Sequence, residues 1–460
     1  MSRSAAIRPL LLALIGTILG CNDLTVPAQA LPSFITIVKG DRQIGEVGTP
    51  LPDSLIVRVT DGTGRPVQDV VVRFVPLGVA ADGQVIPDTA STDPDGQAGT
   101  RWVLSSGAGP VQLEAQVSLG RGNPLTITFS ATALAGPAAI IHALRGDGQS
   151  ATAGTLLSDS LVARVTDRFG NPIAGASIAW HTGDGGTVSD AETSTDANGG
   201  AGVTWWLGNL SGSQTAQATI AGLSGSPLTF TATALPGAPV ALLKVFGDGQ
   251  TAPAGTLLTD SVVAQLVDGL GNGVPGRSIN WVVSPGAGST TPATGTTDAT
   301  GRAFTRWTLG AGAGTQVMNA VVSGLQPAAF TATAVAQAAG KLEAASATAL
   351  VGVAGQPVTP PPAVRVTDGI GNPVRGVTVS FAVRGSGGVV ANRTGQGTVV
   401  TVATDASGVA AVTSWTLGPV AGSDTLEASA TSSNGPLLGS PVRFIALGVP
   451  GPASRLAFLQ

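Results

Sequence analysis

The length, composition and charge of the chain exclude several classes of protein. Its 460 residues are too many for one sandwich-sized domain and fit roughly three or four domains of about 100–150 residues. Hydrophobic residues make up 43% of the chain and charged residues 11%, which excludes a mainly disordered protein. One cysteine and two histidines exclude a disulfide scaffold and a thiolate zinc site. The net charge of −4 provides no basic footprint for nucleic acid.

The amino terminus has the pattern of an export signal. Two arginines precede an apolar run over residues 10–20, which is too short to span a bilayer as a helix. The run ends in Ile-Leu-Gly-Cys21, which resembles the bacterial lipobox and implies cleavage before Cys21 and acylation of that cysteine. We therefore expect a signal peptide over 1–20, a lipidated tether over 21–33, and export to the outer membrane or cell surface. The alternative is a soluble secreted protein with an incidental cysteine.

Three sequence markers recur in constant order at intervals of about 100 residues. The first, Arg-Val-Thr-Asp or a variant of it, ends at Asp61, Asp167, Asp268 and Asp368. The second, Thr-Asp-x-x-Gly, begins at Thr92, Thr195, Thr297 and Thr404. The third, Trp-x-Leu, begins at Trp102, Trp205, Trp307 and Trp415. Solenoid units have only about 20–50 residues, so this period predicts tandem whole domains.

We place four repeats on the chain, followed by the start of another. The repeats are expected at residues 34–135, 136–236, 237–337 and 338–448, and residues 449–460 are expected to be the first strand of an incomplete fifth repeat. That strand either belongs to a truncated product or packs back on the fourth repeat. The linkers are short, which favours a semi-rigid rod. Strands of eight to ten residues predict domains of about 30 Å and a rod of roughly 120 Å.

Each repeat is predicted to consist of β-strands. Leu161, Ala163 and Val165 are separated by one residue each, and this period of two indicates a strand with one buried face. The next segment, Asp-Arg-Phe-Gly-Asn-Pro at 167–172, has the glycine and proline of a turn. Short strands and turns in units of this length predict immunoglobulin-like sandwiches. The expected fold class is all-β, with tandem sandwiches forming an elongated rod.

The tryptophans mark the expected cores. Six of the seven occupy inward repeat positions: Trp102, Trp180, Trp205, Trp281, Trp307 and Trp415. Trp206 follows Trp205 on a strand, so its side chain is expected to point outward. An exposed tryptophan is a candidate contact for a partner. The alternative is packing against a loop or a neighbouring domain.

The period, the Thr-Asp-x-x-Gly and Gly-Asn-Pro turns and the Ala-Thr-Ala ending of the last strand together resemble the bacterial immunoglobulin-like group 1 domains. Those repeats form the stalks of invasin- and intimin-type adhesins. The resemblance covers about residues 34–448 and implies sandwiches of seven to nine strands and a role in adhesion or presentation at a bacterial surface. Such adhesins end in a disulfide-bearing lectin-like tip, which a chain with one cysteine cannot form.

The sequence provides no recognisable catalytic constellation. His142 and His181 lie in different predicted strands, and neither has a repeated acidic neighbour that would complete a triad or a metal site. We therefore expect no catalytic activity, no cofactor and no small-molecule substrate.

Aspartates in Gly-Asp-x-Gln near the start of three repeats leave two interpretations open. Asp41, Asp147 and Asp248 are expected near the joint with the preceding domain, where carboxylates can bind calcium. Calcium requires about six to eight oxygen ligands, more than one aspartate per loop supplies. Turn capping by the side chain, as at Asp167 and Asp196, is the favoured interpretation, and no metal is expected.

These inferences predict a non-catalytic lipoprotein that acts as a stalk or adhesin-like module at the cell surface. It would attach to the membrane through Cys21 and contact a surface protein or a glycan, and nucleic acid is not an expected partner. The alternative is a polysaccharide-binding accessory protein of the cell envelope, in which glycan retention depends on Trp206.

Overall fold

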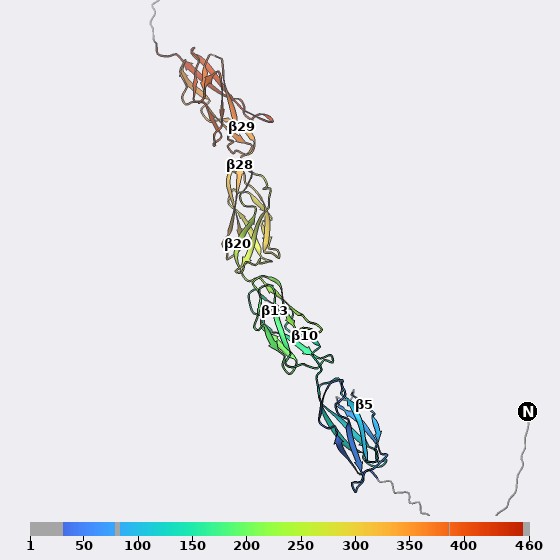
Figure 1. The fold of residues 1–460 in the computed structure, drawn as a ribbon. Helices are drawn as coiled ribbons and strands as arrows, with labels where there is room; N and C mark the ends of the chain where they lie inside the picture. Colours follow the sequence, from blue (N-terminus) through green and yellow to red (C-terminus); the bar gives the residue numbers. More distant parts are fainter. Residues whose placement is uncertain (1–30, 79–82, 386, 454–460) are drawn as a thin grey trace, which may run out of the picture.

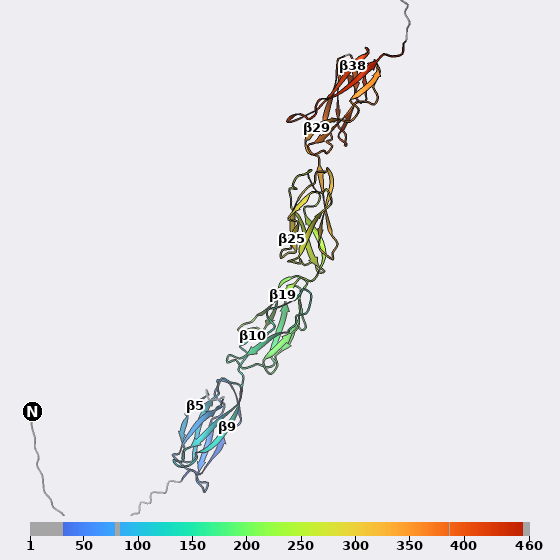
Figure 2. The ribbon, with the colours of Figure 1, turned by 180° about the vertical axis from the view of Figure 1, so that it is seen from behind.

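The chain forms four β-sandwiches that follow one another along one line. In a computed structural model, residues 31–78, 83–385 and 387–453 are described. They contain strands and turns but no α-helix, and hence no helix that could cross a membrane. Figures 1 and 2 show the sandwiches as an extended rod. We number them domains 1 to 4, starting from the amino terminus. The expected all-β fold of tandem immunoglobulin-like sandwiches is confirmed.

Domains 1 and 2 contain the first nineteen strands. Domain 1 comprises β1 (Phe34–Lys39), β2 (Gln43–Glu46), β3 (Leu55–Thr60), β4 (Val71–Leu77), β5 (Gln84–Ile86), β6 (Thr89–Ser91), β7 (Gln97–Val103), β8 (Gly109–Val117) and β9 (Leu125–Leu134). Domain 2 comprises β10 (Ile140–Arg145), β11 (Gln149–Thr152), β12 (Leu161–Thr166), β13 (Ser177–Thr182), β14 (Thr187–Val188), β15 (Glu192–Ser194), β16 (Gly200–Val203), β17 (Trp205–Trp206), β18 (Gly212–Thr219) and β19 (Leu228–Leu235).

Domains 3 and 4 continue the series. Domain 3 comprises β20 (Pro239–Phe246), β21 (Gln250–Pro253), β22 (Val262–Asp268), β23 (Ser278–Val283), β24 (Ser289–Thr291), β25 (Thr294–Thr296), β26 (Arg302–Thr308), β27 (Gly314–Val321) and β28 (Ala328–Val335). Domain 4 comprises β29 (Ala339–Ala344), β30 (Ala349–Val353), β31 (Ala363–Asp368), β32 (Thr378–Arg384), β33 (Val389–Ala391), β34 (Gln396–Gly397), β35 (Val399–Ala403), β36 (Val409–Ala411), β37 (Ser414–Thr416), β38 (Gly422–Ser429), β39 (Thr431–Ser432), β40 (Gly435–Pro436) and β41 (Val442–Val449).

Each domain has a five-stranded sheet with the same order of strands. The orders are β2-β9-β8-β4-β6, β11-β19-β18-β13-β15, β21-β28-β27-β23-β25 and β30-β41-β38-β32-β35. The opposing sheet begins with the first strand of the domain, and in domains 1 and 3 it has four strands, β1-β3-β7-β5 and β20-β22-β26-β24. Pairing is antiparallel except at the edge of the five-stranded sheet, where β2 runs parallel to β9 and β11 runs parallel to β19.

The first stretch of each domain is split between the two sheets. In domain 2, β10 pairs with β12 in one sheet and β11 pairs with β19 in the other. The chain changes sheets at Gly146, whose φ is +92°, and a Cβ at this position would lie 2.3 Å from the carbonyl oxygen of Ser160. Only glycine fits a left-handed conformation with backbone this close. Sequence analysis did not predict this split.

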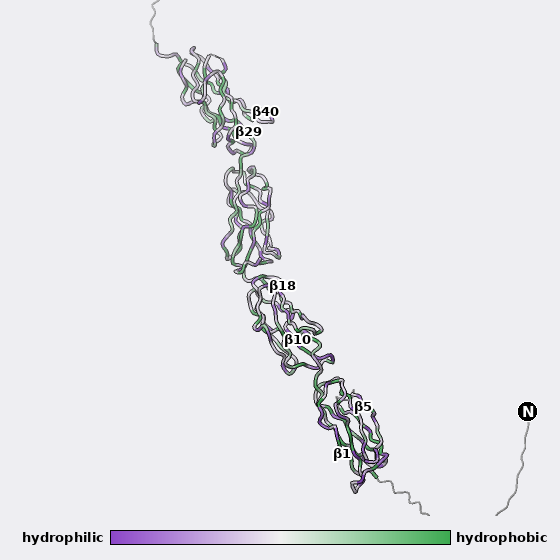
Figure 3. The backbone as a smooth tube through the Cα atoms, viewed as in Figure 1, coloured by the Kyte–Doolittle hydropathy of each residue, from purple (hydrophilic) through white to green (hydrophobic). Residues whose placement is uncertain are grey.

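Four separate hydrophobic cores hold the sandwiches together. Trp102, Trp205, Trp307 and Trp415 are at most 1% exposed. Each packs in a core with one phenylalanine of the last strand, Phe129, Phe230, Phe330 or Phe444, all of which are fully buried. Trp180 and Trp281 are also buried, and their rings lie 5.8 and 6.2 Å from those of Phe230 and Phe330. Figure 3 shows hydrophobic and hydrophilic stretches interspersed along all four domains.

The first two strands run along the length of domain 1. The run β1–β2 crosses the whole of domain 1, since Ser33 lies at the amino-terminal end and Gly48, just after β2, faces domain 2.

Candidate functional site: the joints between domains

The joint between domains 1 and 2 is built on the turn that follows β12. In the sequence Asp167-Arg-Phe-Gly-Asn171, one carboxylate oxygen of Asp167 accepts hydrogen bonds from the backbone N–H groups of Phe169 (2.8 Å) and Asn171 (2.9 Å). This is the expected side-chain capping of a turn. It fixes Phe169 and Asn171 at the end of domain 2 that faces domain 1.

The other carboxylate oxygen of Asp167 contacts the linker. It accepts the N–H of Gly136 at 2.9 Å and the side-chain amide of Asn171 at 2.8 Å. The amide nitrogen of Asn171 also donates to the carbonyl of Ser106 (2.7 Å), and its oxygen accepts the N–H of Ala108 (2.8 Å). Asn171 therefore contacts one donor and one acceptor of the same loop, and these two hydrogen bonds dock domain 2 on domain 1.

The same contacts recur at the next two joints. At joint 2, Asn272 donates to the carbonyl of Asn209 and accepts the N–H of Ser211, both at 2.8 Å. At joint 3, Asn372 makes the equivalent pair with Ala311 and Ala313, again at 2.8 Å. The linker N–H groups of Gly237 and Gln337 donate to Asp268 (2.8 Å) and Asp368 (3.0 Å).

An apolar side chain at the centre of each turn completes the joint. Phe169, Leu270 and Ile370 approach a glycine of the preceding domain: Gly48, Gly154 and Gly255 respectively. A Cβ at Gly48 would lie 2.9 Å from Phe169, and a Cβ at Gly154 would lie 3.3 Å from Leu270. These glycines have φ between +68° and +75°, so a side chain would strain each of the three turns. At Gly48 it would also clash with Phe169 of the neighbouring domain.

Domain 1 lacks the docking residues of the other three. Its turn reads Asp61-Gly-Thr-Gly-Arg65, with Thr63 in the position of the apolar residue and Arg65 in that of the asparagine. Asp61 still caps the turn by accepting the N–H groups of Thr63 and Arg65. Among the residues that the structure describes, domain 1 has no domain before it. The docking residues therefore occur where a preceding domain is present to receive them.

The joint aspartates are held in their ionised form. Burial of Asp167 raises the pKa of its carboxyl, but hydrogen bonds from the Asn171 side chain and from three backbone N–H groups outweigh burial and leave this pKa below its ordinary value. The pKa values of Asp268 and Asp368 are lowered against the effect of burial by the same kinds of donor. These carboxylates are at most 4% exposed.

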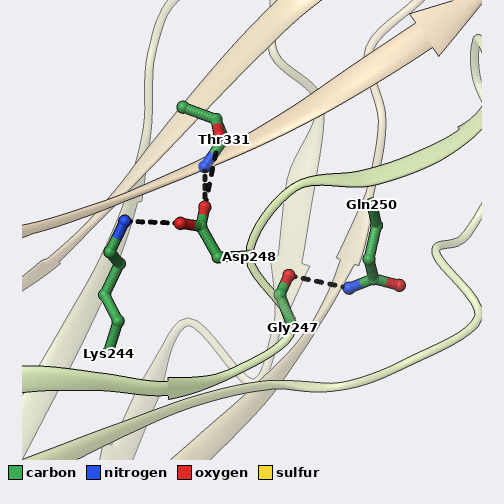
Figure 4. Close-up of polar contacts among 5 residues, drawn as sticks. All are labelled: Lys244, Gly247, Asp248, Gln250 and Thr331. Atoms are coloured by element: carbon green, nitrogen blue, oxygen red, sulfur yellow. Dashed lines mark hydrogen bonds and ion pairs between the residues drawn. The ribbon is translucent and has the colours of Figure 1, made fainter.

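The aspartates expected at the joints lie elsewhere. Asp41, Asp147 and Asp248 contact the last strand of their own domain, where they accept the backbone N–H of Ser130 (2.8 Å), Thr231 (2.7 Å) and Thr331 (2.7 Å). The prediction of a joint position is wrong because Gly-Asp-x-Gln forms the turn at which the first strand changes sheets. In Figure 4, Gln250 closes this turn on the carbonyl of Gly247 (2.8 Å), and Asp248 contacts Thr331 and Lys244.

Those three carboxylates are engaged by hydrogen bonds. Burial raises the pKa of Asp248, yet the Lys244 ammonium and the Thr331 donors lower it below its ordinary value overall. No group of three or more His, Cys, Asp or Glu side chains that could hold a metal ion occurs among the described residues.

The other candidate residues are dispersed. Trp206 is 43% exposed, whereas Trp205 beside it is fully buried. His142 on β10 and His181 on β13 are both exposed. The turn at Asp196 is capped as expected, by the N–H groups of Asn198 and Gly200. Cys21 lies outside the described residues.

Comparison with known proteins places one part of this rod in a family. Residues 143–233, most of domain 2, match the model of the bacterial Ig-like domain (group 1). Domain 2 is therefore similar to the group 1 bacterial immunoglobulin-like domains. Its five-stranded sheet has the strand order found in the other three domains, so the rod repeats one fold.

Several solved structures are similar to this chain of immunoglobulin-like domains. FdeC, an Escherichia coli adhesin, is 21% identical over 66% of this chain and 98% of its own, with a TM-score of 0.39. Invasin, a bacterial integrin-binding protein, is 16% identical over 90% of this chain and 79% of its own, with a TM-score of 0.38. InvD of Yersinia pseudotuberculosis is 17% identical over 68% and 98%, with a TM-score of 0.40. No curated protein matches the chain.

Proposed function

We propose that the protein is a non-catalytic stalk or adhesin-like module, held at the cell surface by a lipid anchor at Cys21. The observation that carries the proposal is the repeated joint, in which a buried aspartate, an asparagine and an apolar side chain dock each of domains 2 to 4 on the domain before it. A chain of independent binding modules does not need fixed angles, whereas a stalk does, because its reach depends on them.

The position of the proposed anchor fits this role. Cys21 precedes domain 1, so the rod would extend outward from the membrane with domain 4 at the distal end. The domains carry few charges, and the described residues contain no metal-binding cluster that would suggest catalysis. One acyl chain gives marginal membrane binding, and several acyl groups on one cysteine give stable attachment.

Palmitate labelling combined with protease treatment of intact cells tests the proposal. The wild-type protein is expected to incorporate labelled palmitate, and added protease is expected to remove its domains from intact cells. The variant Cys21→Ser is the matched control and should lose the label while its domains remain folded. Absence of label in the wild-type protein, or complete protection from protease, would refute the surface-anchored stalk.

A further inference from the structure

The distal end of domain 4 repeats the surface on which domains 2, 3 and 4 are docked. That receiving surface has three parts in each joint. The first is the loop after the Trp-x-Leu strand, at 106–108, 209–211 and 311–313, which provides one carbonyl and one N–H. The second is the glycine turn at Gly48, Gly154 and Gly255. The third is the linker N–H of Gly136, Gly237 and Gln337.

Domain 4 has a counterpart of each of the three parts of the receiving surface. Its loop is Pro419-Val-Ala421, its turn glycine is Gly355 and its linker residue is Gly451. The N–H of Gly355 donates to the carbonyl of Gly418 at 2.9 Å, just as Gly154 donates to Gly208 at 3.0 Å in domain 2. The glycine turn and the loop are therefore held together in the same way in domain 4 as in domain 2.

The surface on domain 4 is uncovered in the described part of the chain. A Cβ at Gly355 would meet no atom within 4 Å, although φ at this glycine is +79° as in the three joints. Residues 419–421 are exposed, as are the loop residues 209–211 and 311–313 in joints 2 and 3, so the loop is accessible in the same way. In the three joints a glycine with this conformation lies against an apolar side chain of the following domain, and at Gly355 that side chain is missing from the described part of the chain.

We propose that this surface docks a further immunoglobulin-like domain whose turn has the sequence Asp-x-apolar-Gly-Asn. The asparagine would bind the carbonyl of Pro419 and the N–H of Ala421, the apolar residue would pack at Gly355, and the aspartate would accept the N–H of Gly451. The linker supports this occupant, because Gly451-Pro-Ala453 repeats Gly136-Pro-Ala138, which leads into domain 2.

A second copy of this chain does not provide the required turn. The turns at 167–171, 268–272 and 368–372 are already engaged in the internal joints. The remaining turn, at 61–65, has Thr63 and Arg65 in place of the apolar residue and the asparagine. The occupant is therefore a domain with the docking residues of domains 2 to 4.

A graft after the domain 4 linker tests the docking surface. Residues 454–460 are replaced by residues 139–235, so that a second copy of domain 2 follows Gly451-Pro-Ala453. Cys21→Ser removes the native thiol, and spin labels on domain 4 and on the graft report their separation by double electron–electron resonance. A label pair at equivalent positions across joint 1 provides the reference, and a second graft of residues 240–335 guards against misfolding of the first.

In the matched control, the graft carries F169T together with N171R. These substitutions introduce the threonine and arginine that the turn of domain 1 has at the same positions. We expect the unaltered graft to give a distance distribution as narrow as that of joint 1, and the control graft to broaden it at least about twofold. Equal widths for the two grafts, or a broad distribution for folded unaltered grafts of both kinds, would overturn the proposal. Dimerisation of the ungrafted chain through the end of domain 4 would also overturn it, because the partner would then be a second copy.

Discussion

Single residues distinguish the four otherwise similar domains. Gln214 and Gln316 are buried behind the receiving loops of domains 2 and 3, and each accepts one backbone N–H at 2.7 Å and donates to two carbonyls. Domain 4 has Asp424 in this position. One oxygen of Asp424 accepts the N–H of Gly418 at 2.8 Å, and the other has no hydrogen-bond partner in the described part of the chain, although the side chain is 1% exposed.

Replacing Asp424 by glutamine, the residue found at this position in domains 2 and 3, is expected to stabilise domain 4. Asp424→Gln provides an amide that can donate to the carbonyls of Gly418 and Val420 and removes a buried oxygen without a partner, a change of about 1–3 kcal/mol in the free energy of unfolding. Denaturant unfolding monitored by hydrogen exchange in domain 4 measures it. The reciprocal variant, Gln316→Asp, should destabilise domain 3 by a similar amount. A neutral or destabilising effect of Asp424→Gln would contradict this account.

At the scale of strands and turns, local sequence patterns correctly predicted which side chains of a single strand are buried and which are exposed. The alternation Leu161, Ala163, Val165 correctly predicted the buried face of β12, and Trp206 is exposed beside buried Trp205 on β17. The split of the first strand was missed because parallel pairing with the last strand joins residues more than 80 positions apart. No local pattern encodes that register.

The joints were missed for a related reason. Asp167 was correctly predicted to cap its turn, but its second oxygen binds Gly136, 31 residues earlier, and Asn171 binds a loop more than 60 residues earlier. The sequence did contain a signal. Comparison of the four turns shows an apolar residue and an asparagine in three of them, and Thr63 and Arg65 in the turn of domain 1. That difference distinguishes a docking turn from a capped turn.

Acid is expected to loosen the joints. The pKa values of Asp167, Asp268 and Asp368 lie below the ordinary value of 3.8. A lowered pKa means that these groups contribute stability above pH 3.8 and lose that contribution as the pH falls through their lowered values. Small-angle X-ray scattering from about pH 5 to about pH 2.5, with circular dichroism as the check on folding, should show shorter mean lengths while the domains remain folded.

The variant Asp268→Asn separates this effect from general acid denaturation. An amide nitrogen facing the linker cannot accept the N–H of Gly237, so the variant should loosen joint 2 at neutral pH and leave joints 1 and 3 unchanged. Joints that tighten as the pH falls would contradict the sign of this prediction.

At the scale of the molecule, the rod combines fixed joints with separate cores. Each domain has its own hydrophobic cluster, and the joints rest on a few hydrogen bonds and one apolar contact. The stability of such an array is a sum of domain terms and smaller nearest-neighbour terms. A rod built in this way can lose one domain locally without unfolding the others.

A core substitution in domain 3 tests this independence. Phe330 is fully buried beside Trp281, so Phe330→Ala is expected to destabilise domain 3 by about 3–5 kcal/mol. Peptide-level hydrogen exchange should show lost protection in β20–β28 and unchanged protection in the cores of domains 2 and 4. Phe304, on β26 of the same domain, is 60% exposed and provides the control, since Phe304→Ala should leave all four domains protected. Loss of protection in the neighbouring cores would mean that the joints couple the domains into one cooperative unit, and that the rod unfolds as a whole.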